Sequence, residues 1–323
     1  MKTNLLGRTG VHVSELCFGT MSFGGDADEH TSAELYAACR DAGINFFDCA
    51  NVYSKGRAEE ILGGLMAHER DDLIITSKVF GPMGPGPNDG GLNRRNIAAS
   101  IEASLKRLGT DRLDIFFIHQ IDPLTPMDET LRGLEDVVRS GKVVYIGASN
   151  HAAWQIALAL GISEREGWNR FDVLQPMYNL VKRQAETEIL PLALDQNLAV
   201  IPYSPAGGGL LSGKYRRGSK PSDARISTNK MYASRYGEEW FYEVAEDFTA
   251  FADKMGVHPM SLAVAWTSSH PAITAPIIGA RNTDQLKASL DSVKIDVTPE
   301  LRAEIAALSR TPAPANDRLE EQK

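Results

Sequence analysis

The sequence predicts an α/β protein built as a (β/α)8 TIM barrel, and three observations lead to that prediction. Eight short apolar runs rich in Val, Ile and Phe recur along the chain, each beside a stretch of helical periodicity. Several helical stretches carry capping residues at their starts and glycines at their ends. No charge run or low-complexity linker divides the chain, so we expect one barrel domain over residues 1–323.

The apolar runs indicate the number of strands. Eight of them match the strand count of the barrel, and they alternate with helices as βα units around a parallel sheet do. The predicted strands cover residues 15–20, 45–50, 73–79, 113–120, 143–149, 171–179, 199–205 and 275–281.

Three of the predicted helices have clear start and stop signals. Residues 93–109 begin at a capping Asn93 and end at Gly109. Residues 28–43 and 125–141 also end at a glycine, and the second of them has acids in its early turns and a basic residue late, which favours the helix dipole. The repeated signals support regular βα units.

Three segments lie outside this alternation. Residues 2–16 are predicted as two short strands around a Gly-Arg-Thr-Gly turn, a hairpin that would cover the N-terminal mouth of the barrel. After the seventh strand a long polar loop, centred on residues 218–239, interrupts the rhythm, and loops of that length are usually functional or disordered. The conformation of residues 216–238 stays open. We expect the tail, residues 311–323, to be flexible or loosely docked.

Composition excludes several classes of protein. A chain with 43% hydrophobic and 24% charged residues is typical of a globular protein with a large core. A formal net charge of −8 argues against a nucleic-acid partner, since phosphates demand clustered Lys and Arg. Cys17, Cys39 and Cys49 have no CxxC spacing, so we expect neither a disulfide framework nor a metal site. No signal peptide or membrane-spanning run is present, and we expect a cytoplasmic protein without a membrane partner.

Polar side chains recur at the carboxyl ends of the predicted strands. In a parallel barrel these ends and the loops after them form the face that carries the active site. Tyr53 belongs to the same face because it lies on the loop after the second strand. The strand-end residues are Asp48, Lys78, His119, Ser149, Asn150, Gln175, Tyr203 and Arg281.

Taken singly, these residues have ordinary structural explanations. His119 in an apolar run is more often a core residue than a catalyst, Tyr53 fits loop packing, and the Ser-Asn pair after the fifth strand fits a helix N-cap. Lys78 is harder to explain, because lysine is rarely buried without a partner, and Asp48 supplies one. The grouping therefore favours a functional site.

A proton-delivery site for a carbonyl oxygen can be assembled from Asp48, Tyr53, Lys78 and His119. Hydride addition to a carbonyl leaves an alkoxide, and a phenol with an ordinary pKa of about 10 is a slow proton donor at neutral pH. The Lys78 ammonium would lower the pKa of the Tyr53 phenol, and Asp48 would keep Lys78 charged. His119 would polarise the carbonyl, so neither a metal nor a covalent nucleophile is expected.

Seven segments in order resemble the motifs of a known family: FFDCANVYSKGRAEEILG, TSKV, LDIFFIHQID, LRGLEDVVRSGKVVYIGASN, LQPMYNLV, VIPYSPAGGGLLSGKY and PIIGARNTDQL. Over essentially the whole chain they resemble the aldo-keto reductase superfamily of the bacterial type, to which channel β-subunits are related. The resemblance implies a barrel that binds NADPH without a Rossmann domain and reduces aldehyde or ketone carbonyls to alcohols reversibly. It also implies a catalytic tetrad of Asp48, Tyr53, Lys78 and His119.

The same resemblance implies a set of cofactor contacts. Ser149, Asn150 and Gln175 would hold the nicotinamide carboxamide, and Tyr203 would stack on its ring. Arg281 could pair with a 2′-phosphate, which favours NADPH over NADH. The further implied contacts are Gly19, Thr20, Met21, Asp48, Ser204, Ala206, Gly207, Leu210, Ser212, Lys214, Ala280 and Gln285.

Four positions depart from the family pattern. Ser289 stands where the family usually has Asn, and Ala288 where it often has an acid, which affects the implied adenine contacts. Ser54 follows Tyr53 where Gly is common, and Gln120 follows the histidine. None of these changes removes a proton donor.

Two other functions compete with a carbonyl reductase. Residues 208–214, GGLLSGK, match a phosphate-binding loop except that Tyr215 stands where Ser or Thr must hold magnesium, which argues against a nucleotide hydrolase. The Rossmann fingerprint GxGxxG is also absent after the first strand. The remaining alternative is an NADP(H)-binding sensor or regulatory subunit with little turnover, and the intact tetrad favours an enzyme over it.

The substrate stays open. Met21, Phe23, Phe80, Trp240 and the loop 81–91 are candidates for the pocket wall, and their composition suits aldehydes and ketones in general. Trp240 is explained equally well by packing of the helix that follows the long loop. Neither the oligomeric state nor the preferred reaction direction can be read from the sequence.

Overall fold

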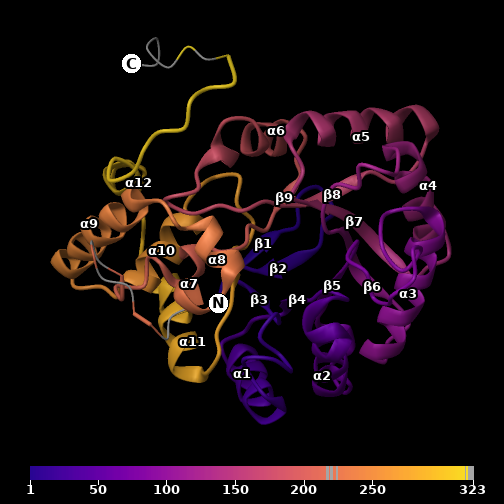
Figure 1. Cartoon of the computed structure of the whole chain (residues 1–323), viewed down its shortest axis with the longest axis horizontal. Coiled ribbons are helices and arrows are strands. Elements are labelled where there is room, and N and C mark those ends of the chain that lie inside the picture. The colour runs from indigo at the N-terminus through magenta and orange to yellow at the C-terminus, as the bar shows by residue number, and fades with distance from the viewer. Residues whose placement is uncertain (216–217, 219–220, 223–224, 317, 319–323) are drawn as a thin grey trace.

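Eight parallel strands form the barrel that the sequence predicts. The computed structural model describes residues 1–215, 218, 221–222, 225–316 and 318, and Figure 1 shows the strands at the centre with the helices around them. The barrel strands are β3 (Cys17–Gly19), β4 (Phe46–Asp48), β5 (Ile74–Val79), β6 (Leu113–Ile118), β7 (Val143–Ser149), β8 (Phe171–Gln175), β9 (Ala199–Val200) and β10 (Ile277–Ile278). They pair in the order β10, β3, β4, β5, β6, β7, β8, β9.

Backbone hydrogen bonds join the two ends of this order and close the barrel. Thr274 N donates to Val200 O (2.8 Å), and Ile277 N donates to Pro202 O (2.8 Å). Tyr203 pairs with Ile277 in a parallel bridge. Closure brings the carboxyl ends of all eight strands to one rim.

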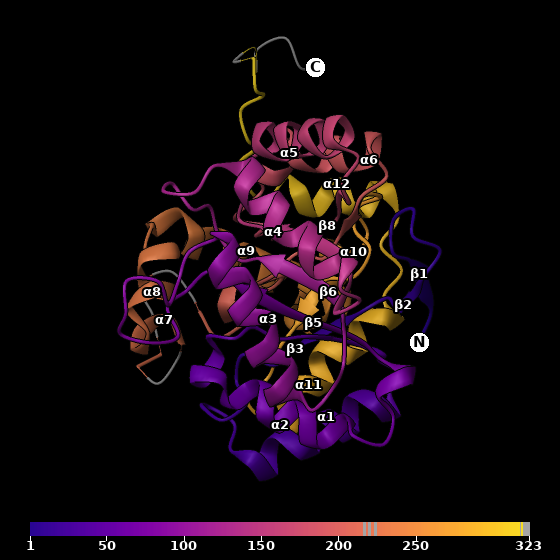
Figure 2. The same ribbon diagram turned by 90° about the vertical axis from the view of Figure 1, so that its right-hand side faces the viewer.

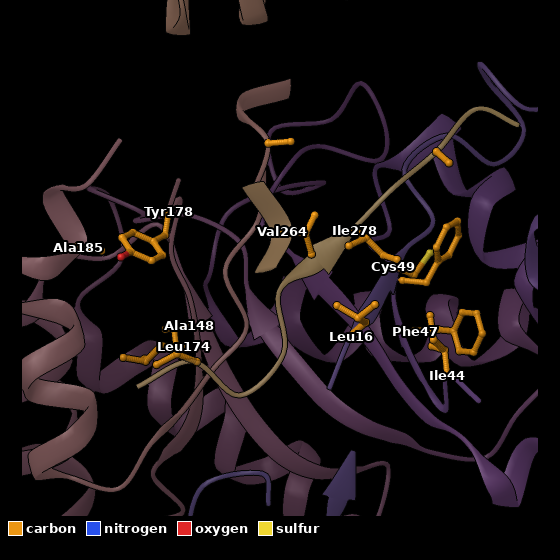
Figure 3. Packing of buried hydrophobic residues seen from close by; sticks show 14 of the residues in the cluster. Leu16, Ile44, Phe47, Cys49, Ala148, Leu174, Tyr178, Ala185, Val264 and Ile278 are labelled. Carbon is orange, nitrogen blue, oxygen red and sulfur yellow. The ribbon is translucent and has the colours of Figure 1, made fainter. Parts of the chain in front are cut away.

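Alternate side chains along the strands pack on opposite faces of the barrel wall. Phe46, Ile115 and Phe117 are fully buried in a compact cluster inside the barrel. Phe47 and Phe116 belong to a larger outer cluster, which joins the wall to the helices. Figure 3 shows Phe47 in this outer cluster beside residues from several other elements.

The N-terminal hairpin covers one end of the barrel, as predicted. Its strands, β1 (Thr3–Leu5) and β2 (His12–Ser14), pair antiparallel. Leu6 and Val13 are fully buried and join the interior cluster. Figure 2 shows the hairpin at one end of the barrel, so the opposite rim is the one left for a site.

The helices surround the barrel wall, as Figure 1 shows. They are α1 (Glu29–Asp41), α2 (Arg57–Met66), α3 (Arg94–Leu108), α4 (Met127–Arg139), α5 (Ala153–Glu166), α6 (Ile189–Asp195), α7 (Arg225–Thr228), α8 (Lys230–Arg235), α9 (Glu239–Met255), α10 (Pro259–Ser268), α11 (Thr283–Leu290) and α12 (Pro299–Ala306). The predicted signals of α3 are present, since the Asn93 side chain accepts from Asn96 N (3.0 Å) and Gly109 has a left-handed φ of 62°. In the part of the chain described here, no helix is both long and apolar enough to span a bilayer.

The segment after the seventh strand differs from the predicted loop because α7 and α8 lie within it. The Asn229 side chain caps α8 by accepting from Met231 N (3.0 Å), a local preference that the polar composition concealed. Figure 2 shows these two helices at the end of the barrel opposite the hairpin. Residues 216–217, 219–220 and 223–224 of the predicted loop lie outside the described residues.

The tail predicted to be flexible is described only in part. Residues 317 and 319–323 lie outside the described residues. Residues 311–316 form neither helix nor strand, and Thr187 Oγ1 donates to Ala313 O (3.2 Å). This part of the tail therefore contacts the barrel domain through at least one hydrogen bond.

Candidate active site

The four residues predicted to be catalytic meet at the carboxyl end of the barrel. Asp48 is the last residue of β4, Lys78 lies one residue before the end of β5, and His119 directly follows β6. Tyr53 begins the 3-10 turn after β4. Neighbouring parallel strands thus deliver the carboxylate, the ammonium and the imidazole to one rim.

A strained turn places Tyr53 over this rim. Ser54 and Lys55 adopt left-handed φ angles of 47° and 55° inside the turn Tyr53–Gly56, a conformation that costs non-glycine residues about 1 kcal/mol or more. Ser54 Oγ donates to Phe23 O (2.8 Å). The serine that departs from the family pattern therefore anchors the turn through its own side chain.

Lys78 lies at the centre of the site and is fully buried. Its ammonium donates to Asp48 Oδ2 (2.6 Å), to Cys49 O (2.6 Å) and to Tyr53 OH (3.3 Å). These contacts use all three N–H donors of the ammonium. Its charge is therefore held between a carboxylate and a phenol.

Asp48 is also buried, and its second carboxylate oxygen accepts two hydrogen bonds. Oδ1 accepts from Thr76 Oγ1 (2.7 Å) and from Gln175 Nε2 (2.8 Å). The backbone oxygen of Asp48 accepts from Thr20 Oγ1 (3.0 Å). A buried carboxylate is stable only when it is paired and hydrogen-bonded. Lys78 supplies the pairing, and Thr76 and Gln175 supply the hydrogen bonds.

The pKa of Tyr53 corrects one step of the sequence-based chemistry. Burial raises the pKa of the phenol, the Lys78 ammonium lowers it, and the net pKa is about 12. Lysine acts in the expected direction, but desolvation outweighs it, so the phenol is not brought below its ordinary pKa of about 10. Tyr53 therefore keeps its proton at neutral pH, with the Lys78 ammonium 3.3 Å from its oxygen.

His119 lies beside the phenol as a neutral ring. The ring centroids of Tyr53 and His119 are 6.1 Å apart in an edge-on arrangement. Burial, with the positive charges of Lys78 and Arg235, lowers the pKa of His119 to about 3. Burial alone would also lower the pKa of Lys78, but the Asp48 carboxylate reverses that shift and the net direction is upward. The site thus combines a protonated phenol, a charged lysine and a neutral imidazole.

Comparison with known proteins decides the family. The sequence profile of the Aldo/keto reductase family matches residues 15–310. This chain belongs to the aldo/keto reductase family. An oxidoreductase function follows from membership in that family.

Curated relatives of this aldo/keto reductase match along almost their whole length. The uncharacterized oxidoreductase YrpG of Bacillus subtilis is 37% identical over 313 residues, covering 93% of this chain and 94% of the relative. A probable voltage-gated potassium channel subunit beta of Arabidopsis thaliana is 38% identical over 308 residues, or 93% of each chain. The versiconal hemiacetal acetate reductase of Aspergillus parasiticus is 33% identical over 324 residues, covering 91% of this chain and 93% of the relative.

The rim that carries Asp48, Tyr53 and His119 opens into a cleft of about 610 Å³. A cavity of this size lies within the range of small-molecule and cofactor sites. Most of the predicted site residues line it: Gly19, Met21, Asp48, Tyr53, His119, Ser149, Asn150, Gln175, Tyr203, Ser204, Ala206, Ser212, Lys214, Ala280, Arg281 and Gln285.

Four predicted residues do not line the cleft. Lys78 and Thr20 are fully buried behind the lining: Lys78 contacts Asp48 and Tyr53, and Thr20 contacts the backbone of Asp48. Leu210 is fully buried in the outer cluster, so its side chain faces the core. Gly207 is buried in a 3-10 turn with a left-handed φ of 62°, which it needs in order to redirect the chain.

Polar residues at the end of the cleft next to His119 bond to one another. Asn150 Nδ2 donates to His119 O (2.9 Å) and to Ser149 Oγ (3.1 Å). Asn150 Oδ1 accepts from Tyr203 OH (2.6 Å), and Ser149 Oγ donates to Gln175 O (2.9 Å). Asn150 also has a left-handed φ of 60°. The amide predicted to hold a nicotinamide carboxamide therefore already links His119 to Tyr203.

Several predicted wall residues lie elsewhere. Phe23 is fully buried in the outer cluster, and Phe80 packs against that cluster. The Trp240 ring packs under the Arg310 guanidinium (4.5 Å). Neither these side chains nor the loop 81–91 line the cleft. Packing of its own helix is thus the explanation that holds for Trp240.

Sequence reasoning missed lining residues from the segments after the seventh and eighth strands. Arg235 ends α8, His258 and Met260 lie at the start of α10, and Asp284 lies on α11. Arg235 carried one signal, a cation among aromatic residues in an unusually long loop. The others carried none, because the sequence does not show which face of a terminal helix turns towards the cleft.

Proposed function

We propose that this protein is an NADPH-dependent carbonyl reductase that converts aldehydes or ketones to alcohols reversibly. The observation that carries the proposal is the Tyr53 phenol at the cleft, 3.3 Å from the buried ammonium of Lys78. Carbonyl reduction needs a proton donor at the point where the oxygen becomes an alkoxide. A protonated phenol backed by a fixed cation meets that need.

In this proposal the chain's own residues donate the proton and stabilise the group that loses it. A bound reduced nicotinamide would supply the hydride to the carbonyl carbon. Tyr53 OH gives its proton to the carbonyl oxygen, and the neutral alcohol forms. Lys78, held by Asp48, stabilises the phenolate that remains until water in the cleft returns the proton. His119 stays neutral and donates a hydrogen bond from its protonated ring nitrogen to the same oxygen.

The donor set of the cleft fits NADPH. Tyr203 would offer an aromatic face, and Gln175 keeps hydrogen-bonding capacity beyond its contact with Asp48. Lys214 and Arg281 would hold phosphates, with Arg281 as the partner proposed for the 2′-phosphate that distinguishes NADPH from NADH. Gly209 lines the cleft at a φ of 98°, and open space lies where its Cβ would be, so backbone can approach a phosphate.

Binding and turnover measured on one preparation test this proposal. Titration monitored by fluorescence should show tighter binding of NADPH than of NADH. NADPH should then be oxidised with members of an aldehyde and ketone panel. Protein that binds NADPH but oxidises it with no carbonyl compound would contradict the reductase.

The channel-subunit relative favours one alternative, an NADP(H)-binding sensor or regulatory subunit with little turnover. That function needs the cleft but not the chemistry of Tyr53. The same panel separates the two proposals. Binding without turnover supports the regulatory subunit, whereas turnover that Tyr53→Phe abolishes supports the enzyme.

A further inference from the structure

The lining of the cleft carries more positive than negative charge, although the chain has a net charge of −8. In the described part of the chain its cations are Lys214, Arg235 and Arg281, and its carboxylates are Asp48 and Asp284. Asp48 is already paired with a buried ammonium. An excess of positive charge in a cleft concentrates anionic ligands. Lys214 and Arg281 have proposed roles with cofactor phosphates, which leaves Arg235.

Arg235 differs from the other two cations in its contacts. Its guanidinium lies over the rings of Tyr203 (5.9 Å) and Tyr232 (5.8 Å). Among the residues that the structure describes, no carboxylate pairs with Arg235 and no oxygen accepts from it. Stacking on aromatic faces leaves the donors at the edge of the planar guanidinium free for a bidentate partner.

Hydrogen bonds connect the ring under Arg235 to the catalytic end of the cleft. Tyr203 OH donates to Asn150 Oδ1 (2.6 Å), and Asn150 Nδ2 donates to His119 O (2.9 Å). Burial and the Lys78 ammonium are larger causes of the low pKa of His119, and the positive charge of Arg235 adds to them. Arg235 therefore acts electrostatically on the ring that would face a carbonyl oxygen.

Apolar side chains with exposed surface line the same cleft. Met21 is 43% exposed and Met231, on α8 with Arg235, is 39% exposed. Methionine adapts to ligands of different shape, so these side chains suit an apolar body of variable outline. A ligand that contacts both methionines and Arg235 has an apolar body and an anionic end.

We propose that Arg235 is a substrate-specificity residue that binds the carboxylate of a carbonyl substrate. The protein then prefers oxo acids and carboxylated aldehydes to neutral carbonyl compounds. This inference rests on the proposed reductase function. Charge-assisted pairing with one carboxylate corresponds to about 10- to 100-fold in kcat/KM.

The first experiment compares para-carboxybenzaldehyde with its methyl ester as substrates. The ratio of kcat/KM for the acid to that for the ester should favour the acid in the wild-type protein. Arg235→Gln should lower this ratio about 10- to 100-fold. Arg235→Lys should recover part of it, because lysine keeps the charge but lacks the planar fork. Equal kcat/KM values for acid and ester in the wild-type protein would overturn the proposal.

A matched control variant and the Michaelis constant for NADPH show whether Arg235 binds the substrate carboxylate or a cofactor phosphate. Arg310→Gln removes another stacked arginine, over Trp240 and outside the cleft, and should leave the ratio unchanged. The Michaelis constant for NADPH should stay the same in Arg235→Gln. If that constant rises while the ratio of acid to ester stays constant, Arg235 holds a cofactor phosphate and the proposal is wrong.

A binding measurement separates this inference from the proposed function. Calorimetry on the NADPH-loaded protein should show that benzoate binds better than benzamide, and that Arg235→Gln removes the difference. This result supports the anion site even if no carbonyl compound is reduced. Benzoate binding that is insensitive to Arg235→Gln contradicts the anion site even if reduction is observed.

Discussion

Two faces of one strand contact buried ion pairs with different consequences. On β5, Lys78 faces the barrel interior and pairs with Asp48 (2.6 Å). The preceding residue, Ser77, faces the helices and donates to Glu59, which pairs with Arg107 (2.6 Å). Each pair contains a carboxylate that is almost or completely buried. The inner pair differs because its ammonium continues to the Tyr53 phenol at the cleft.

A buried ion pair does not by itself indicate chemistry. Glu59 lies on α2 and Arg107 on α3, so the outer pair holds two helices against the barrel wall. The inner pair holds a charge beside the Tyr53 phenol, the group proposed to give its proton to a ligand. Breaking either pair should cost stability. Only the inner pair should also cost turnover.

Lys78→Met should have the largest effect. The Tyr53 phenolate would lose the cation that stabilises it, and turnover should fall by about 10²- to 10⁴-fold. The pKa of Tyr53 should rise further, because the ammonium is what lowers it against burial. Single-turnover rates per folded molecule, with NADPH affinity as the control, check this. Near-normal rates would mean that the inner pair is structural, like the outer one.

Glu59→Ala tests the outer pair. It should lower the free energy of unfolding by about 3 kcal/mol, the lower end of the range for a broken buried pair, because Arg107 keeps some access to water. Turnover per folded molecule should not change. Urea denaturation gives the first quantity and the carbonyl assay the second. A loss of turnover comparable to that in Lys78→Met would remove the proposed distinction between the two faces.

The barrel and its strand ends could be predicted because they follow from local patterns. Asp48, Lys78 and His119 end apolar runs, and parallel strands bring those ends to one rim regardless of how the helices pack. The net pKa of Tyr53 depends on burial, which a linear sequence does not show. The sequence therefore predicted correctly that Lys78 lowers the pKa of Tyr53, but the predicted net shift of that pKa was wrong, because burial raises it by more.

The far side of the cleft could not be predicted for a different reason. Arg235 reaches it through α8, a short helix in a segment without clear periodicity. His258 caps α10 by accepting from Met260 N (3.1 Å), and the same turn lines the cleft. Such positions depend on how a helix is rotated, which tertiary contacts decide. Trp240 shows the converse, since this aromatic residue beside the long loop packs outside the cleft.

The pH dependence of the free energy of unfolding should reveal the lowered pKa of His119. Burial is the main cause that lowers the pKa of His119 to about 3, whereas the unfolded chain has a histidine pKa of about 6.5. Between these values the unfolded state binds more protons, so the free energy of unfolding falls as the pH drops below about 6.5. His119 should contribute about 2 kcal/mol to this loss between pH 7 and pH 5.

Unfolding measured at these two pH values in the wild-type protein and in His119→Asn checks the assignment. The variant should lose less stability on acidification than the wild-type protein does. Turnover in the wild-type protein should show no step near the ordinary histidine pKa of about 6.5, because His119 stays neutral there. An identical pH dependence of unfolding in the two proteins would contradict the buried, neutral imidazole.

Arg281→Ala should have the smallest effect and should concern the cofactor alone. Loss of the proposed partner of the 2′-phosphate should raise the Michaelis constant for NADPH about tenfold, corresponding to about 1.4 kcal/mol. The constant for NADH should change little, since NADH lacks that phosphate. Steady-state kinetics with both cofactors measures the difference. An equal rise for NADPH and NADH would reject the pairing.

The most direct test of the central claim compares two tyrosines, of which Tyr53 lines the cleft and Tyr36 does not. Tyr53 is proposed to give its proton to the carbonyl oxygen, whereas Tyr36 on α1 donates to Glu69 (2.5 Å) away from the cleft. The measurement is the single-turnover rate of NADPH oxidation at saturating cofactor in Tyr53→Phe and Tyr36→Phe. We expect a fall of about 100-fold or more for Tyr53→Phe with unchanged NADPH affinity, and a normal rate for Tyr36→Phe. A near-normal rate in Tyr53→Phe would contradict its role as the proton donor.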